Sequence, residues 1–381
     1  MIDKDIFEDL FVLEMANNHL GSVERGLRII SEFAQVVRFN NVRATIKLQF
    51  RDVARFVHKD YTTSPERYIA KTMRTALTDD EYATLVKAIR QAGCIPTATP
   101  FDERSVDLCV EFGLPIIKVA SSDLNDWILL EKIAKTKKPV VISTGGSSLK
   151  DMDDVVTFFA NRNIPLAINH CVSIYPTEDS ELELNQIDFL RARYPNNTIG
   201  FSTHECTDWR DSMLVAYAKG ARTFERHIDT DSDGTKVSPY CSLPHQIDEW
   251  FKAFDKAKSM CGAPGTQKRI PPRKEIEYLD LLVRGVYAKH DLPEGHQLTD
   301  DDVYLAIPLC KGQLSCRELM KGELLLQPVK ADQAIRIDDI ESPYSQIPSL
   351  RKLIYARGMA PAVDRSGAGA EQLSAKAAAH K

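Results

Sequence analysis

The chain has 381 residues, of which 43% are apolar and 27% are charged, and its formal net charge is -5 at pH 7. This balance is typical of a globular protein with a sizeable core, and the length fits a barrel of about 250 residues followed by a smaller domain. Scattered basic residues argue against a nucleic-acid-binding protein, and eight cysteines without a C-x-x-C pair argue against a zinc finger or a disulfide framework.

The sequence also lacks the features of a membrane or secreted protein. No segment approaches the roughly 18 consecutive apolar residues that a membrane-spanning helix needs. The first residues, MIDKDIFEDL, are acidic, whereas a signal peptide is basic and then apolar. We therefore expect a cytoplasmic protein that has no membrane partner.

Short runs rich in β-branched residues alternate with longer amphipathic segments in the first two thirds of the chain. The runs predict eight strands, at residues 10–16, 44–50, 94–100, 115–121, 139–145, 165–171, 197–203 and 221–227. This alternation favours a parallel sheet, and eight such units favour closure into a (β/α)8 TIM barrel, which we place at residues 1–262. The alternative is an open doubly wound sheet, but the sequence lacks the G-x-G-x-x-G turn that typically marks that fold.

The remainder of the chain predicts a second, smaller domain. Residues 263–277 contain glycine, proline and charge without apolar periodicity, as a linker does. Residues 278–342 contain short strand-like runs separated by turn residues, so we expect a small β-rich domain that docks on another surface. Residues 343–381 end in a segment rich in Ala, Gly, Ser and Lys, and we expect this tail to be largely disordered.

Polar side chains lie at the end of every predicted barrel strand, where the loops of a TIM barrel converge on one mouth. Each has an ordinary interpretation by itself, because a lysine can extend to solvent, a histidine can pack in a core, and Ser or Thr can form a turn. Their joint occurrence at one mouth instead favours a site. The residues are Glu14, Lys47, Gln49, Thr99, Lys118, Ser121, Ser143, His170, Ser173, Tyr175, Ser202, His204 and His227.

Two of these side chains, Lys47 and Lys118, lie within apolar runs. Burial of a lysine inside a barrel is costly unless an anion offsets its charge. Lysines and hydroxyl groups that converge on one mouth therefore predict a bound phosphate or carboxylate.

A metal site is predicted beside this anion site. His204 and His227 follow two strands that are neighbours in a closed barrel, so their imidazoles can reach one ion. Two histidines without clustered cysteines suit Mn²⁺ or Mg²⁺ with oxygen ligands better than a closed zinc site. Glu14, His19 and His170 are candidates for completing or orienting the ligand shell, and packing in the core is an equally good interpretation of His170.

The motifs of the barrel follow a known order. Eight consecutive segments read VLEMANNHLG, IKLQF, TATPFD, IKVASSD, ISTGGSS, NHCVSIYPT, GFSTH and FERH. In this order they resemble the barrel motifs of the N-acetylneuraminate (sialic acid) synthase family, and RGVYAKHDLPEGHQLTDDDV resembles the antifreeze-like (SAF) domain that follows the barrel in that family. The resemblance covers nearly the whole folded chain. It implies a transferase that condenses phosphoenolpyruvate with a sugar aldehyde, giving a nonulosonate or another 3-deoxy-2-ulosonate plus phosphate.

The resemblance also implies roles for single residues. His204 and His227 would bind the divalent ion, which acts on the aldehyde as a Lewis acid, with Glu14 beside it. Gln49 and Tyr175 would face the sugar. The SAF domain of one subunit caps the barrel of the other in this family, which implies a homodimer. The residues that would hold phosphoenolpyruvate are Lys47, Thr99, Lys118, Ser121, Ser143 and Ser202.

Four positions depart from the family pattern, and they concern the acceptor sugar. Ser173 stands where the family usually has Asn, Asp123 where it has Glu, and Ser238 where it has Asp. Ile307 stands where the family has an arginine that reaches the N-acetyl group of the sugar bound in the partner subunit. An apolar side chain cannot supply that hydrogen bond. With Asp123 and Ser173 kept as substrate-binding candidates, we hypothesise the same condensation on an acceptor other than N-acetylmannosamine.

Three other interpretations remain open at this stage. A barrel of the 3-deoxy-octulosonate phosphate synthase type acts on a phosphorylated aldose and needs a further basic pair, which Arg51 and Arg226 could supply. A non-catalytic sugar-binding barrel is a second interpretation, although the retained lysines and histidines argue against it. A lyase that runs the condensation backwards is the third, because the sequence does not fix the direction.

Overall fold

The structure is a computed structural model that describes residues 6–263, 265–318 and 322–360. The chain divides into two compact units at residue 264.

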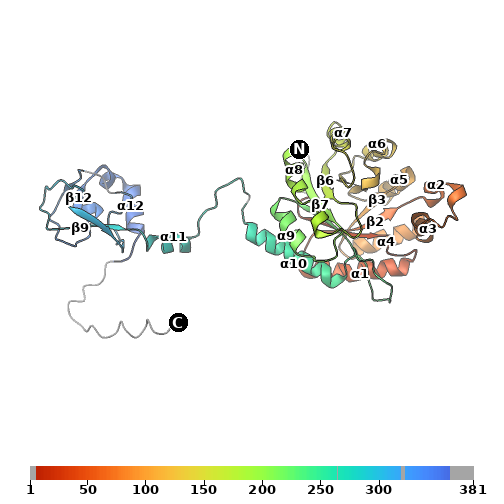
Figure 1. The fold of residues 1–381 in the computed structure, drawn as a ribbon, viewed down its shortest axis with the longest axis horizontal. Coiled ribbons are helices and arrows are strands. Elements are labelled where there is room, and N and C mark those ends of the chain that lie inside the picture. Colours follow the sequence, from red (N-terminus) through yellow and green to blue (C-terminus); the bar gives the residue numbers. More distant parts are fainter. Residues whose placement is uncertain (1–5, 264, 319–321, 361–381) are drawn as a thin grey trace. The chain divides into compact units, whose positions relative to one another are not determined.

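The first unit is a closed barrel of eight parallel strands, in which each strand pairs with the next and β8 pairs with β1 (Figure 1). The prediction of a (β/α)8 barrel is confirmed. β1 and β2 coincide with the predicted segments, and the later strands begin slightly after the predicted positions. The strands are β1 (Leu10–Ala16), β2 (Ala44–Phe50), β3 (Ile95–Pro100), β4 (Ile117–Val119), β5 (Val140–Ser143), β6 (Leu166–Cys171), β7 (Thr198–Thr203) and β8 (Thr223–His227).

Helices surround the barrel on the outside. Five of those on the barrel, α1, α4, α5, α6 and α7, begin at a Ser, Thr or Asp whose side chain caps the first turn. At α4, for example, Thr78 accepts a hydrogen bond from the backbone N–H of Glu81, whose carboxylate accepts one from the N–H of Thr78 at 2.7 Å. The helices are α1 (Val23–Asn40), α2 (Val53–Phe56), α3 (Arg67–Arg74), α4 (Asp79–Gln91), α5 (Glu103–Glu111), α6 (Trp127–Lys135), α7 (Leu149–Ala160), α8 (Asn185–Arg193), α9 (Asp211–Ala218) and α10 (Pro244–Cys261).

The main core lies between the outer face of the barrel and these helices. Phe11 on β1 is 1% exposed, and its ring centroid lies 4.7 Å from that of Phe251 and 5.2 Å from that of Trp250, both on α10. Edge-to-face contacts of this kind add to the stabilisation from burying the rings. Because alternate residues of a strand point to opposite faces, the other half of each strand points into the barrel.

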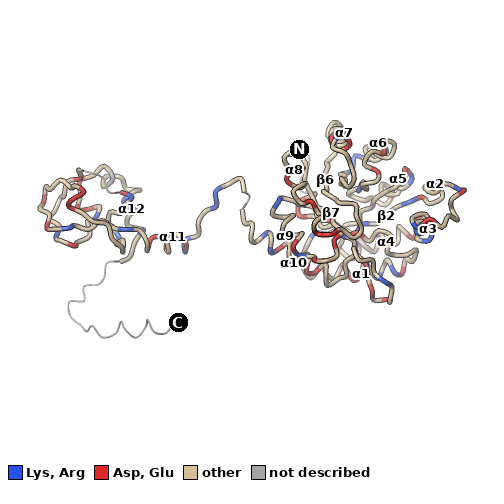
Figure 2. The backbone as a smooth tube through the Cα atoms, viewed as in Figure 1, with Lys and Arg blue, Asp and Glu red and all other residues tan. Residues whose placement is uncertain are grey.

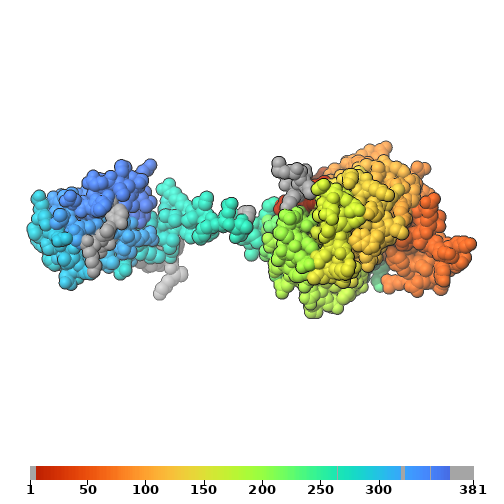
Figure 3. Space-filling view, turned by 90° about the horizontal axis from the view of Figure 1, so that it is seen from above, coloured from red at the N-terminus to blue at the C-terminus, as the bar shows by residue number. Residues whose placement is uncertain are grey.

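One excursion departs from a regular (β/α) repeat. Between β2 and α4 the chain forms α2, the short 3-10 helix η2 (Lys59–Tyr61) and α3. This segment, coloured orange, projects from one side of the barrel unit in both the ribbon and the space-filling view (Figures 1 and 3). It contributes several residues to the site described below.

The second unit is small and has its own core. It contains two two-stranded antiparallel sheets, β9 (Gly285–Ala288) with β10 (Val303–Ala306) and β11 (Leu324–Leu325) with β12 (Ile340–Glu341). These sheets match the predicted β-rich domain. The buried apolar residues that pack together include Val286, Leu314, Ile335, Ile337 and Ile340.

Two helices lie at the borders of this unit, in segments that the sequence predicted as linker and tail. Helix α11 (Arg273–Asp280) occupies part of the predicted linker, and α12 (Pro348–Ala356) occupies part of the tail that we expected to be disordered. The tail folds here because Ile354 is 1% exposed in the core of the unit, and Arg357 forms an ion pair with Glu318 at 2.6 Å. The rest of the predicted tail, residues 361–381, lies outside the described residues.

Basic and acidic residues are interspersed over both units (Figure 2). Among the described residues, no helix combines the length and the apolar character that crossing a membrane requires.

Candidate active site

A cavity of about 720 Å³ opens at the carboxyl ends of the barrel strands. All of the predicted site residues except Asp123, His19 and His170 line it, and together they come from every strand or from the loop that follows it. These residues are Glu14, Lys47, Gln49, Thr99, Lys118, Ser121, Ser143, Ser173, Tyr175, Ser202, His204 and His227.

At the buried end of the cavity lie Lys47 and Lys118, which we call the deep lysines, and each is 4% exposed. The ammonium group of Lys47 pairs with Glu14 and, at 3.0 Å, with Glu225. That of Lys118 lies 3.7 Å from the other oxygen of Glu225 and donates a hydrogen bond to Ser143. Two buried lysines thus share two buried carboxylates.

Burial and neighbouring charges affect the pKa values of the two deep lysines differently. Burial lowers the pKa of Lys118, and Glu225 offsets this only in part. Burial also opposes the charge of Lys47, but Glu14 and Glu225 together raise its pKa above the ordinary value. In turn the two lysines hold the pKa of Glu225 well below its usual range against the effect of burial, while burial raises the pKa of Glu14. Lys118 is therefore the less compensated lysine and the better candidate to receive an anion.

His204 and His227 lie side by side, with ring centroids 5.3 Å apart. The ring of Tyr175 lies over His204 at 4.0 Å between centroids. Burial lowers the pKa of His204 to about 4 and that of His227 well below the ordinary value, so both imidazoles are neutral, which is the form that binds a metal ion. His204 Nδ1 is 2.9 Å from the carbonyl oxygen of Val172, which leaves its Nε2 for a ligand.

Unsatisfied polar atoms beside these rings fit an open metal site. Nδ1 of His227 and Oε1 of Glu14 are both buried without a hydrogen-bond partner, and their residues are direct neighbours in the pairing of β8 with β1. In the described part of the chain, no three His, Cys, Asp or Glu side chains form a ready ligand cluster. Two imidazoles with further positions left for water or substrate suit a divalent catalytic ion better than a closed structural site.

Three residues that the sequence suggested for the site do not line the cavity. His19 and His170 do not line the cavity: His19 accepts a hydrogen bond from the N–H of Gly21, and His170 contacts the carbonyl oxygen of Leu182 at 2.7 Å. His170 is thus a packed core residue. Asp123 ends the 3-10 turn η3 (Ser121–Asp123), and this turn brings Ser121 rather than Asp123 to the cavity.

Arg226 is not available for a second phosphate either. On β8 it alternates with Glu225 and His227, so it points to the opposite face, where it is 1% exposed and pairs with Glu205 at 2.7 Å. The predicted pair of Arg51 and Arg226 therefore does not form, although Arg51 does line the cavity.

Other residues of the cavity were missed in the sequence. Glu225 could have been found, because it lies two positions before His227 on a strand and must share its face. The residues of α3 and its neighbours carried no such signal, because they belong to a loop excursion. The missed residues are Ala16, Asn17, Asn18, Glu66, Arg67, Tyr68, Lys71, Phe101, Ala120, Ser122, Gly145, Cys171, Glu225 and Tyr240.

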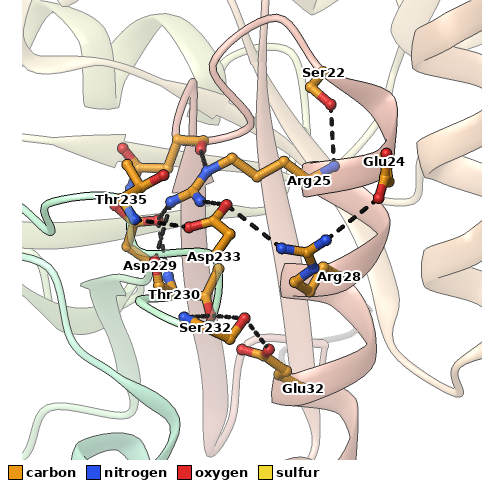
Figure 4. Close-up of polar contacts among 11 residues, drawn as sticks. Ser22, Glu24, Arg25, Arg28, Glu32, Asp229, Thr230, Ser232, Asp233 and Thr235 are labelled. Atoms are coloured by element: carbon orange, nitrogen blue, oxygen red, sulfur yellow. Dashed lines mark hydrogen bonds and ion pairs between the residues drawn. The ribbon is translucent and has the colours of Figure 1, made fainter.

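A buried arginine fixes two loops at the mouth of the barrel (Figure 4). Arg25 on α1 is 6% exposed and donates from Nε to the carbonyl oxygen of Asn18 at 2.7 Å. Its other nitrogens bind Asp229 at 2.6 Å, the carbonyl oxygen of Thr230 at 3.1 Å, and Asp233. Arg25 thereby joins the loop after β1 to the loop after β8, and the latter carries Tyr240 to the cavity.

Comparison with known proteins identifies the family. The NeuB family model matches residues 32–265, and the SAF domain model matches residues 283–341. The chain belongs to the NeuB family and carries a C-terminal SAF domain, so the resemblance seen in the sequence is confirmed.

Individual relatives agree with this assignment. A crystal structure of a spore coat polysaccharide biosynthesis protein E from Chromobacterium violaceum is 36% identical, covers 88% of this chain and all of that chain, and has a TM-score of 0.84. N-acetylneuraminate-9-phosphate synthase of Homo sapiens is 28% identical over 79% of this chain and 84% of that protein. The N-acetylneuraminic acid synthetase structure from Leptospira borgpetersenii is 25% identical, covers 71% of this chain and 91% of that one, and has a TM-score of 0.62.

Proposed function

We propose that the chain condenses phosphoenolpyruvate with a sugar aldehyde to give a nonulosonate or a related 3-deoxy-2-ulosonate plus phosphate. The observation that carries this proposal is that the deep lysines and the paired imidazoles of His204 and His227 open into one cavity. Membership of the NeuB family and the synthase names of the relatives support it.

Phosphoenolpyruvate fits the buried end of this cavity, because it carries both a phosphate and a carboxylate. The deep lysines supply the opposite charge. The hydroxyl groups of Thr99, Ser121, Ser143 and Ser202 supply neutral hydrogen-bond donors around them. A fixed arrangement of donors orients the substrate before reaction and does not reorganise during it.

The divalent ion, which we take to be Mn²⁺ or Mg²⁺, would be held by His204 and His227. When bound there it acts as a Lewis acid on the aldehyde oxygen. Glu14 lies beside it, and Gln49 and Tyr175 line the part of the cavity left for the sugar. These residues keep the aldehyde carbon facing the bound enol phosphate.

The reaction forms one carbon–carbon bond and breaks one carbon–oxygen bond. The C3 carbon of phosphoenolpyruvate bonds to the aldehyde carbon, and the aldehyde oxygen takes up a proton. Water adds at C2 and loses a proton, giving a tetrahedral intermediate. The bond between C2 and the phosphate oxygen then breaks, the second proton of that water leaves, and a 2-keto acid and inorganic phosphate remain.

The chain is also expected to form a homodimer in which the SAF domain of one subunit covers the barrel of the other. Exposed apolar side chains on the second unit support an assembly role, since Leu281 is 51%, Leu282 is 57% and Ile307 is 57% exposed. Light scattering should give the mass of a dimer at micromolar concentration, and a monomer would contradict this expectation.

The test of the proposed function is phosphate release from phosphoenolpyruvate with a panel of aldoses, together with the metal content of His204→Ala. We expect this variant to lose both bound metal and turnover. His245→Ala, an exposed histidine on α10, is the control and should keep both. Unaltered metal content in His204→Ala would reject the ligand assignment, and no phosphate release with any aldose would reject the reaction.

A further inference from the structure

Three cations gather at the other, more exposed part of the cavity. Arg51 follows β2, and Arg67 and Lys71 lie on α3; we call these three the rim cations. Lys71 lies four residues after Arg67, so both project from the same face of the helix. Two like charges at this spacing destabilise a helix unless an anion lies between them.

The rim cations have no carboxylate partner among the residues that the structure describes. Arg51 is 8% exposed, and its contacts are to neutral groups: it donates to Oε1 of Gln49 and to the hydroxyl of Tyr68, both at 3.0 Å, and lies 3.7 Å from the ring centroid of Phe101. Its Nε is buried without a partner. A buried guanidinium that meets only neutral groups is costly, and a bound anion would remove that cost.

Three acidic residues near the rim are engaged elsewhere or exposed. Asp229 pairs with Arg25, and Asp102 caps α5 by accepting from the N–H of Ser105 at 2.8 Å. Glu66 lines the cavity, but it is exposed. Burial, together with Arg51 and Arg67, lowers the pKa of Lys71, as expected where positive charges accumulate.

The spacing of residues along β2 shows that the rim cations are separate from the deep lysines. Lys47, Gln49 and Arg51 are alternate residues of one extended segment, and four residues of strand span about 13 Å. Gln49, which we assign to the sugar, lies between the lysine and the arginine. An anion bound at the rim is therefore separate from the phosphoenolpyruvate and belongs to the far end of the acceptor.

We infer that Arg51, Arg67 and Lys71 bind a phosphate monoester on the acceptor sugar. This inference rests on the proposed function. The three cations are sufficient to balance the two negative charges of a phosphate dianion, and guanidinium groups match its oxygen geometry. The acceptor is thus a sugar phosphate whose aldehyde lies at the metal and whose phosphate lies at the rim.

The test compares acceptors and variants in the full-length protein. Phosphate release is measured with N-acetylmannosamine, its 6-phosphate and a uronic acid, in the wild type and in Arg67→Gln and Lys71→Gln. We expect kcat/KM to be at least about tenfold higher for the phosphorylated sugar. Each variant should raise the KM for that sugar by about tenfold, because each removes a charge-assisted hydrogen bond, and should leave the KM for phosphoenolpyruvate within about twofold. Arg74→Gln, on the same helix but outside the cavity lining, should leave both KM values unchanged.

Several results would overturn the inference while the proposed function stands. These are preference for the free sugar, preference for the uronic acid, or a rise in the KM for phosphoenolpyruvate in the variants. A change in dimer mass without a change in acceptor KM would instead assign the rim cations to a second copy of the chain. If no acceptor is turned over, the proposed function fails. The rim site can then still be tested by calorimetric measurement of sugar phosphate binding. Binding that the variants weaken supports the rim site, and equal or absent binding rejects it.

Discussion

The buried end of the cavity and its exposed end both carry positive charge, but they balance it differently. The deep lysines face Glu14 and Glu225, so most of their charge is compensated within the protein. In the described residues the rim cations meet no carboxylate at all. A compensated cation can hold a substrate without a large cost to stability, whereas an uncompensated group gains its counter-charge only from a ligand. The comparison assigns phosphoenolpyruvate to the buried end and an anionic acceptor group to the exposed end.

The largest effect is expected from Lys118→Met, which removes the less compensated deep lysine. We expect kcat/KM for phosphoenolpyruvate to fall by about a thousandfold, because a buried charged donor is lost. The variant also leaves Glu225 with a single counter-charge, so it should unfold at a lower temperature.

Adding Glu225→Gln to Lys118→Met separates these two causes. The double variant should regain part of the lost thermal stability and none of the activity. Recovery of activity together with stability would mean that Lys118 only supports the fold. In that case the assignment of phosphoenolpyruvate to the buried end of the cavity would be wrong.

Arg25→Ala is expected to have the second-largest effect, on both stability and acceptor binding. It leaves Asp229 buried without its partner and frees the loop that carries Tyr240. Breaking a buried ion pair typically costs about 3–5 kcal/mol of stability. Calorimetry should show this loss, and steady-state kinetics should show an acceptor KM raised by about tenfold. Arg28→Ala, which removes a half-exposed neighbour of the same loop, is the control and should change both values little. Equal effects of the two substitutions would contradict the role given to Arg25.

A change in salt concentration should affect the KM values of the two substrates differently, and by less than the substitutions above. Charges near solvent are screened within about 8 Å at physiological ionic strength, and buried pairs much less. Between low and high salt we expect the KM for the acceptor to rise several-fold and the KM for phosphoenolpyruvate to rise less. The same rise for both substrates would show that both bind in equally exposed surroundings.

The smallest effect is expected from Thr78→Ala at the start of α4. Loss of the N-cap hydrogen bond should lower the free energy of unfolding by about 1 kcal/mol. Both KM values should remain those of the wild type, because this position lies outside the cavity. A change in either KM would mean that lowered stability alone alters the site, and the kinetic tests above would lose their meaning.

The sequence predicted the parts of this molecule that follow from strand periodicity. The eight strands and the residues at their ends, such as Lys118 and His227, could be found because parallel strands deliver their ends to one mouth. Glu225 follows from the same alternation, although it was missed. Arg226 was assigned to the wrong face, because its position was judged without that alternation.

The remaining residues of the site depend on tertiary structure that no local pattern encodes. Arg67 and Lys71 line the cavity because the excursion between β2 and α4 brings α3 to it, whereas Asp123, at the end of the 3-10 turn η3, does not line it. His170 looked like a possible ligand at a strand end but is packed in the core. Likewise α12 was missed because Ile354 belongs to a core whose other members, such as Val286 and Leu314, are distant in the sequence.

The central claim is that phosphoenolpyruvate condenses with the aldehyde and loses its phosphate by cleavage at C2. Mass spectrometry after reaction of phosphoenolpyruvate that carries ¹⁸O in the bridging position between C2 and phosphorus tests it most directly. The account predicts a product with the mass of both substrates plus water less phosphoric acid, and the label in the released phosphate. Label retained in the 2-keto group, or release of phosphate without a joined product, would contradict it.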